Sequence, residues 1–114
     1  MKRIEAIIQM DKVGSVSDAL KKAGHPGLTV TKIKGYGYRE SLPRRFRGVS
    51  FSHKVDHITK AKVELTINES EIDAIVDAIR KAAYAGSVGN GKIFIHPVDD
   101  AMRICLGKEE VNAL

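Results

Sequence analysis

The sequence predicts an α+β fold whose elements follow the order β-α-β-β-α-β. Four segments alternate apolar and polar residues, as half-buried strands do, and two segments between them repeat apolar residues at helical spacing. This order is that of the ferredoxin-like sandwich, in which two helices cover one face of a four-stranded sheet. The 114 residues have room for one domain, residues 1–114. The other face of the sheet would be bare, so we expect copies of the chain to associate.

The first half of the chain supplies a strand, a helix and a second strand. Apolar and polar residues alternate over residues 4–10, which predicts the first strand. Residues 15–18 (Ser-Val-Ser-Asp) resemble a capping box, which predicts a helix start, and Gly24 ends that helix. Residues 28–34 are rich in β-branched side chains and predict the second strand.

The second half repeats this pattern after a long loop. Residues 61–67 alternate apolar with charged or polar side chains, which predicts the third strand. Asn68 and Glu71 are placed to cap a helix that buries apolar residues as far as Ala83, and Gly86 would supply a left-handed stop. Residues 92–96 predict a short last strand that ends at Pro97.

The loop between the second and third strands is the most unusual segment. Residues 38–57 show no clean period, and a loop of this length in a compact domain is usually functional or mobile. Between Tyr38 and Lys60, six Lys and Arg residues stand against two acidic residues, so this segment holds most of the net charge of +5. A basic loop on a nearly neutral body predicts a contact surface for an anion or an acidic partner.

Composition and motifs exclude several classes of protein. No apolar run approaches the roughly 20 residues of a membrane span, and the single Cys105 fits a reducing cytoplasm. His53, Asp56 and His57 have a metal-ligand spacing that requires a helix, but they fall in a loop, so we expect no metal site. No Ser-His-Asp, paired-carboxylate or Cys-His arrangement is evident, so we expect no catalytic residues and no enzyme.

Five segments match motifs of one known family: residues 1–8 (MKRIEAII), 27–37 (GLTVTKIKGYG), 47–51 (RGVSF), 89–95 (GNGKIFI) and 101–107 (AMRICLG). Together they resemble the PII nitrogen-regulatory signalling proteins, in register over nearly the whole chain. The resemblance implies a cytoplasmic homotrimer. It also implies a mobile T-loop at about residues 37–57, a B-loop at about residues 85–92 and a C-terminal tail at residues 98–114.

The resemblance implies an adenine-nucleotide site in a cleft between subunits. Thr29 and the backbone near Thr66 would face the adenine, with Glu64 and Gly35 near the ribose. The phosphates would lie against glycines and cations, one of them from the neighbouring subunit. By itself the Gly-x-Gly-Lys motif of the B-loop is more often a turn than a phosphate cradle. The implied nucleotide-binding residues are Thr29, Gly35, Gly37, Tyr38, Glu64, Thr66, Gly89, Asn90, Gly91, Lys92 and, from the neighbour, Arg103.

Three departures from the family pattern bear on which nucleotide binds. Cys105 replaces the second tail arginine, Tyr38 replaces a common arginine, and Arg39 replaces the glutamine that orients Mg²⁺ and 2-oxoglutarate. A guanidinium cannot ligate a metal, but it pairs with phosphates and carboxylates. We therefore expect ADP or AMP to be favoured over Mg-ATP with 2-oxoglutarate, and no cofactor to be required. Arg39 and Lys60 would form an altered site for an effector anion.

The implied function is that of a nucleotide-sensing regulator that controls a target protein, such as a membrane transporter or an enzyme, through its T-loop. Arg44, Arg45, Arg47 and Phe51 are the expected partner-binding residues of that loop. Phe51 stands where some members have a modifiable tyrosine, and it has no hydroxyl to modify. One alternative is a PII-like sensor of another small anion such as bicarbonate, as in carboxysome-associated members. A less favoured alternative is nucleic-acid binding by the basic loop, which lacks the spaced aromatics of a stacking platform.

Overall fold

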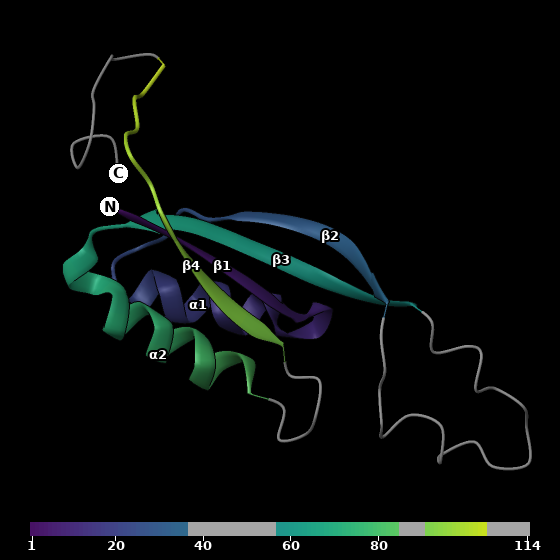
Figure 1. Cartoon of the computed structure of the whole chain (residues 1–114). Coiled ribbons are helices and arrows are strands. Elements are labelled where there is room, and N and C mark those ends of the chain that lie inside the picture. Colours follow the sequence, from purple (N-terminus) through teal and green to yellow (C-terminus); the bar gives the residue numbers. More distant parts are fainter. Residues whose placement is uncertain (37–56, 85–90, 105–114) are drawn as a thin grey trace, which may run out of the picture.

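The computed structural model describes residues 1–36, 57–84 and 91–104, and it confirms the predicted order of strands and helices. All three strand pairings are antiparallel, and the sheet has the order β2-β3-β1-β4 (Figure 1). The two outer strands of this sheet therefore come from opposite halves of the chain. The elements are β1 (Lys2–Gln9), the 3₁₀ turn η1 (Met10–Lys12), α1 (Val13–Lys22), β2 (Thr29–Tyr36), β3 (His57–Ile67), the 3₁₀ turn η4 (Glu69–Glu71), α2 (Ile72–Ala83) and β4 (Lys92–Pro97).

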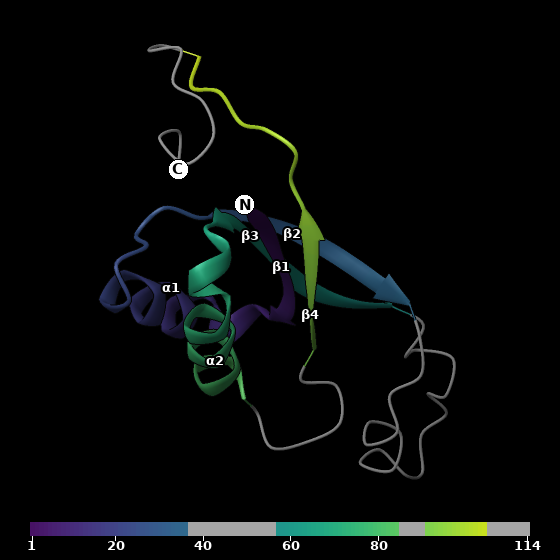
Figure 2. The ribbon, with the colours of Figure 1, turned by 60° about the vertical axis from the view of Figure 1, so that its left-hand side comes forward.

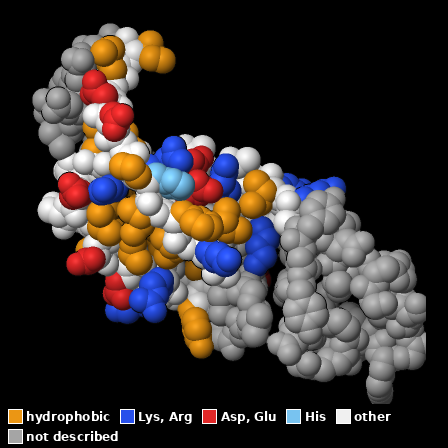
Figure 3. All heavy atoms as spheres, in the orientation of Figure 1, with side chains coloured by type: hydrophobic (Ala, Val, Ile, Leu, Met, Phe, Trp, Pro, Cys, Tyr) orange, Lys and Arg blue, Asp and Glu red, His pale blue; other side chains and the backbone are white. Residues whose placement is uncertain are grey.

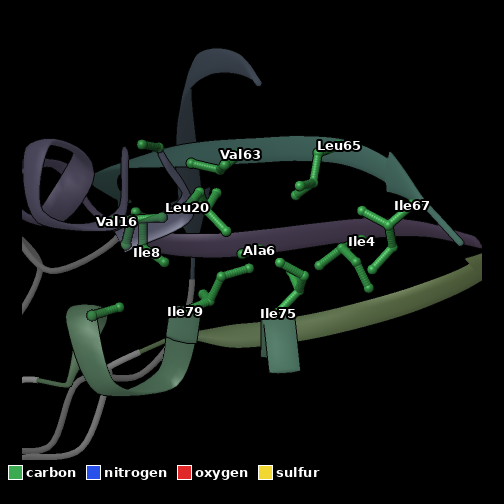
Figure 4. Close-up of a cluster of buried hydrophobic side chains, with 12 residues drawn as sticks. Ile4, Ala6, Ile8, Val16, Leu20, Val63, Leu65, Ile67, Ile75 and Ile79 are labelled. Atoms are coloured by element: carbon green, nitrogen blue, oxygen red, sulfur yellow. The ribbon is translucent and has the colours of Figure 1, made fainter. Parts of the chain in front are cut away.

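Both helices pack on one face of the sheet, and the hydrophobic core lies between the two layers (Figures 2 and 4). Because side chains alternate along a strand, every second residue of the two central strands points into this core. Leu20 of α1 and Ile75 and Ile79 of α2 complete it from the helix side. The buried core residues are Ile4, Ala6, Ile8, Val16, Leu20, Ala61, Val63, Leu65, Ile67, Ile75, Ile79 and Ala83.

The opposite face of the sheet, which we call the open face, is covered by no described element. It is formed by the residues that alternate with the core positions, and charged side chains dominate it at the two central strands. Ile7 and Ile33, which stand out of phase in the sequence, are half-buried on this face. The open face is thus mostly charged, with a few apolar positions. Its members on β1 and β3 are Arg3, Glu5, Ile7, Gln9, Lys60, Lys62, Glu64 and Thr66.

The predicted helix starts were wrong in detail, and both errors have the same cause. Each helix is preceded by a 3₁₀ turn, so α1 already begins at Val13, and Ser15 lies inside the helix instead of capping it. Asn68 makes no side-chain cap hydrogen bond; its carbonyl accepts one from the Glu71 N–H at 3.0 Å. A 3₁₀ turn satisfies the first N–H groups through backbone carbonyls, so side-chain caps are not needed.

The ends of the elements otherwise follow the sequence signals closely. Gly24 ends α1 with φ +91°, a left-handed conformation that glycine adopts without strain. β3 begins at His57, four residues before the predicted strand. α2 ends at Ala83, and Tyr84 is already extended, while Gly86 lies outside the described residues. Neither described helix has the length and apolar character that a membrane span requires.

Candidate functional site

Three of the predicted nucleotide-binding residues meet at one end of the sheet, which we call the first end. Thr29 of β2 pairs with Glu64 of β3, and Thr66 pairs with Arg3 of β1. All four line a hollow of about 570 Å³ together with residues 24–28 of the α1–β2 connection. This volume lies within the roughly 300–1,000 Å³ that is typical of small-molecule sites. The structure therefore brings together the residues expected at the adenine and Glu64, one of the two residues expected at the ribose.

The α1–β2 connection forms the rim of this hollow and is fixed at two points. The His25 N–H donates to the Leu20 carbonyl at 2.8 Å, which closes the turn at the end of α1. The His25 ring lies 3.1 Å, Nε2 to Oε2, from the Glu71 carboxylate at the start of α2. His25 thus joins the rim of the hollow to the second helix.

A chain of charged side chains crosses the open face beside the hollow. Arg3 lies between two carboxylates, with Nε 3.6 Å from Oε2 of Glu64 and a terminal nitrogen 3.8 Å from Oε1 of Glu5. His96 of β4 follows, with Nε2 3.2 Å from Oε1 of Glu5. Charged side chains of both signs gather around a histidine in the space-filling view (Figure 3). Arg3 was not among the residues predicted from the sequence, because only the register of β1 with β3 brings it onto the same face as Glu64.

The second end of the sheet holds the residues expected at the phosphates and the effector anion. Gly35 lies near the end of β2 and Lys60 near the start of β3, and Gly91 directly precedes Lys92, the first residue of β4. Lys92 is exposed, and it makes no ion pair with any described residue. Gly91 and Lys92 line a separate, largely apolar hollow of about 280 Å³ between the strands and the end of α2.

Packing alone explains why position 91 is glycine. Gly91 has φ +115°, and a Cβ added there would lie 1.8 Å from the Ile7 carbonyl oxygen. Any other residue would force the start of β4 away from β1. Gly91 therefore sets the position of Lys92 against the sheet, whether or not its own N–H contacts a ligand.

Arg103 and Lys92 lie toward opposite ends of β4. Lys92 pairs with Ile7 of β1, and Pro97 pairs with Lys2 of β1. Along β1, Lys2 and Ile7 are five residues apart, which is about 17 Å at ~3.3 Å per residue. The Val98 N–H donates to the Met1 carbonyl at 3.2 Å, and the tail then leaves the sheet beyond the first end (Figures 1 and 2). Within one chain, Arg103 and Lys92 do not converge.

Gly35 and Glu64, both expected near the ribose, are separated in the same way. Gly35 pairs with Ile58, which is six residues, or about 20 Å, along β3 from Glu64. The predicted nucleotide residues thus form two half-sites. The first-end half-site has Thr29, Glu64 and Thr66, and the tail that carries Arg103 leaves the sheet at the same end, whereas the second-end half-site has Gly35, Gly91 and Lys92.

Several predicted site residues lie outside the described residues. They are Gly37, Tyr38, Arg39, Arg44, Arg45, Arg47, Phe51, Gly89 and Asn90, together with Cys105. The same holds for His53 and Asp56. Over residues 1–36, 57–84 and 91–104, no three His, Cys, Asp or Glu side chains gather closely enough to hold a metal ion.

Comparison with known proteins assigns the family. Residues 1–108 match the family described as nitrogen regulatory protein P-II. The chain belongs to the PII family. The nitrogen regulatory P-II proteins of Synechocystis sp. and Bradyrhizobium diazoefficiens are each 39% identical over 114 residues, which is 100% of both chains. P-II 2 of Methanothermobacter thermautotrophicus is 38% identical over 114 residues, covering 100% of this chain and 97% of its own.

A solved PII structure confirms the fold. Arabidopsis thaliana PII, in a crystal structure bound to citrate, matches this chain with a TM-score of 0.82 at 27% identity. The match covers 99% of this chain and 91% of the other. This PII-family chain therefore has the ferredoxin-like α+β fold, and its relatives from Synechocystis sp. and Bradyrhizobium diazoefficiens are named as nitrogen regulatory proteins.

Proposed function

We propose that this PII-family protein is a non-enzymatic regulator that senses adenine nucleotides in a cleft completed by two copies of the chain. The observation that carries the proposal is the division of the site into two half-sites. One end of the sheet has a hollow lined by Thr29 and Glu64, and the other end has the exposed cation of Lys92. A nucleotide needs both a nucleoside pocket and phosphate-binding cations. Neither end of the sheet provides all of the predicted nucleotide-binding residues.

The same division favours a closed ring of copies. If the first end of one copy meets the second end of the next, the contact is head-to-tail, and such contacts form rings when the rotation closes. The family resemblance implies a ring of three copies. The expected result is a homotrimer in light scattering at micromolar concentration, and a stable monomer would contradict the proposal.

Mixing two variants tests whether the cleft is shared. In Lys92→Ala every cleft lacks the second-end cation, and in Arg103→Ala every cleft lacks the tail cation, so both homotrimers should bind ADP weakly. In trimers re-formed from a mixture, each mixed ring regains one cleft with both cations. At that contact, the Arg103→Ala copy supplies Lys92 and the Lys92→Ala copy supplies Arg103. Recovery of tight ADP sites on mixing is the expected result. No recovery would mean that both cations act within one chain.

The proposed ligands are ADP and AMP in preference to Mg-ATP with 2-oxoglutarate. The support is chemical: Arg39 and Cys105 stand where the family has a metal-orienting amide and a second tail cation. Calorimetry with AMP, ADP and ATP, with and without Mg²⁺ and 2-oxoglutarate, measures the preference directly. Arg39→Gln with Cys105→Arg should shift it toward Mg-ATP. Sharp tightening of ATP binding by 2-oxoglutarate in the natural protein would contradict this preference.

The proposed output is control of a protein target, such as a transporter or an enzyme, by the T-loop. Four of its arginines repel one another, and an anion bound near Lys60 would change which loop conformers are populated. Deleting residues 40–50 should abolish target binding while the trimer and its ADP affinity remain. Target binding by the shortened trimer would place the contact elsewhere.

A second candidate is a sensor of a small anion, for example bicarbonate, on the same fold. The PII of Arabidopsis thaliana was crystallised with citrate, which supports the binding of a small carboxylate by a chain of this fold. Adding bicarbonate to the ADP titrations separates the two candidates. Anion binding without any nucleotide favours the second candidate, and anion binding only with nucleotide favours the first.

A further inference from the structure

We propose that Arg3 is a positioning residue of the first-end half-site, where it holds the Glu64 carboxylate in place for the ribose of a bound nucleotide. The inference rests on the proposed function, because it assigns a role within the proposed nucleotide cleft. Arg3 lines the same hollow as Thr29, Glu64 and Thr66.

Glu64 and Glu5 need a cation between them. They are register partners on β3 and β1 and share the open face, and like charges directly opposite each other are destabilising. The Arg3 guanidinium lies 3.6 Å from one carboxylate and 3.8 Å from the other. A single guanidinium is therefore shared between a carboxylate that lines the hollow and one that does not.

The two carboxylates have different second partners. Glu5 also lies near His96, whose Nε2 is 3.2 Å from Oε1 of Glu5 but forms no hydrogen bond with it, whereas Glu64 has no other charged partner among the described residues. Among the described residues, Arg3 is thus the one cation that contacts Glu64. Glu5 competes for that guanidinium.

The geometry leaves Arg3 with unused hydrogen-bonding capacity. Its Nε atom is buried and has no hydrogen-bond partner, because 3.6 Å to Glu64 is too long for a hydrogen bond. A small movement of the Glu64 carboxylate toward Arg3 would complete that bond. A carboxylate fixed in this way accepts a hydrogen bond from a ribose hydroxyl at a lower entropic cost than a freely rotating one.

The test compares ADP with 2′-deoxy-ADP and 3′-deoxy-ADP by calorimetry. Each analogue lacks one ribose hydroxyl that could donate a hydrogen bond to the Glu64 carboxylate. The wild type should prefer ADP by about 10- to 150-fold over at least one analogue, the range for a hydrogen bond to a charged group. Arg3→Gln and Glu64→Gln should each reduce this preference by about 5-fold or more, with little change in affinity for that analogue. Arg3→Lys should recover part of the preference for ADP over the deoxy analogue, and Glu5→Gln should retain or increase that preference.

Two controls make the outcome specific to Arg3. Lys62→Gln removes a cation from the same face, two residues from Glu64, at a position that does not line the hollow, and it should keep the full preference. The double variant Arg3→Gln with Glu64→Gln should lose no more than Glu64→Gln alone, because both changes remove the same interaction.

The results that overturn the inference differ from those that overturn the proposed function. If the wild type binds no adenine nucleotide, both fail. If the wild type prefers ADP and Arg3→Gln keeps that preference, or if the two losses add in the double variant, only the role of Arg3 fails. An Arg3→Gln chain that no longer assembles would place Arg3 in the contact between copies and would also overturn its positioning role.

Discussion

The two faces of the sheet use the same strands for different purposes. On the helix-covered face, β1 and β3 present Ile4 and Val63, which are fully buried in the core. One residue along each strand, the open face presents Glu5 and Glu64, which belong to a network of charged side chains. The strand period of two thus separates stability from the proposed binding chemistry within single strands.

This contrast teaches that neighbouring residues of this protein should respond differently to substitution. A change on the helix-covered face should lower the free energy of unfolding and leave ligand affinity unchanged. A change at a proposed ligand-binding residue of the open face or the second end should instead lower ligand affinity and leave the free energy of unfolding nearly unchanged.

The largest effect is expected in the core. Ile4→Ala removes a fully buried side chain and should lower the free energy of unfolding by about 2–5 kcal/mol, as truncation of buried aliphatic residues does. Denaturant titration measures the loss. The matched control is Ile33→Ala, the same truncation of a half-buried residue on the open face, where the loss should be smaller and should depend on protein concentration. Equal, concentration-independent losses would break the contrast.

Gly91→Ala should affect both stability and binding. The new Cβ would clash with the Ile7 carbonyl, so the start of β4 must move and carry Lys92 with it. The control is Gly14→Ala in α1, outside both hollows, where no atom lies within 4 Å of the added Cβ. Stability should rise there by up to about 1 kcal/mol, because alanine is the better helix former, with ADP affinity unchanged. If both variants behave alike in thermal unfolding and calorimetry, the contact with Ile7 has no role in positioning Lys92.

Lys92→Ala should separate binding from stability most cleanly. Loss of a charge-assisted phosphate contact should lower ADP affinity by roughly 10- to 150-fold. The unfolding midpoint without ligand should not change, because Lys92 is exposed and makes no ion pair with a described residue. Lys32→Ala is the control, since it removes an exposed cation from β2 outside both hollows. Unchanged ADP affinity in Lys92→Ala would mean that the phosphates lie elsewhere.

The smallest effect is expected for His25→Gln. His25 and Glu71 are partly exposed, and such contacts contribute about 0.2–1 kcal/mol. The loss should appear as a small fall in the unfolding midpoint together with a fewfold weaker affinity for ADP, because His25 also lines the first-end hollow. Glu71→Gln should reproduce the fall in stability. A large effect of either variant would show that the rim of the hollow determines the stability of the whole domain.

The comparison of sequence and structure shows where local patterns suffice. The alternation at Ile4 and Ile8 and the helical spacing of Ile75 and Ile79 predicted both the elements and their buried sides. Gly24 predicted a helix end because a left-handed residue needs no distant partner. The capping prediction at Ser15 failed because the preceding 3₁₀ turn takes over the first N–H groups, and such turns leave little trace in a hydrophobic pattern.

Local sequence patterns were enough to predict the order of the elements, the face that each strand residue occupies and the family. Which of those residues meet depends on the tertiary fold. It placed Thr29 beside Glu64 and Arg3 between two carboxylates, and it packed Gly91 on Ile7, which is 84 positions away in the chain. It also separated Glu64 from Gly35 and Lys92 from Arg103. The physical reason is that periodicity reports the local environment of each residue, whereas strand order and register are set by pairing between distant segments.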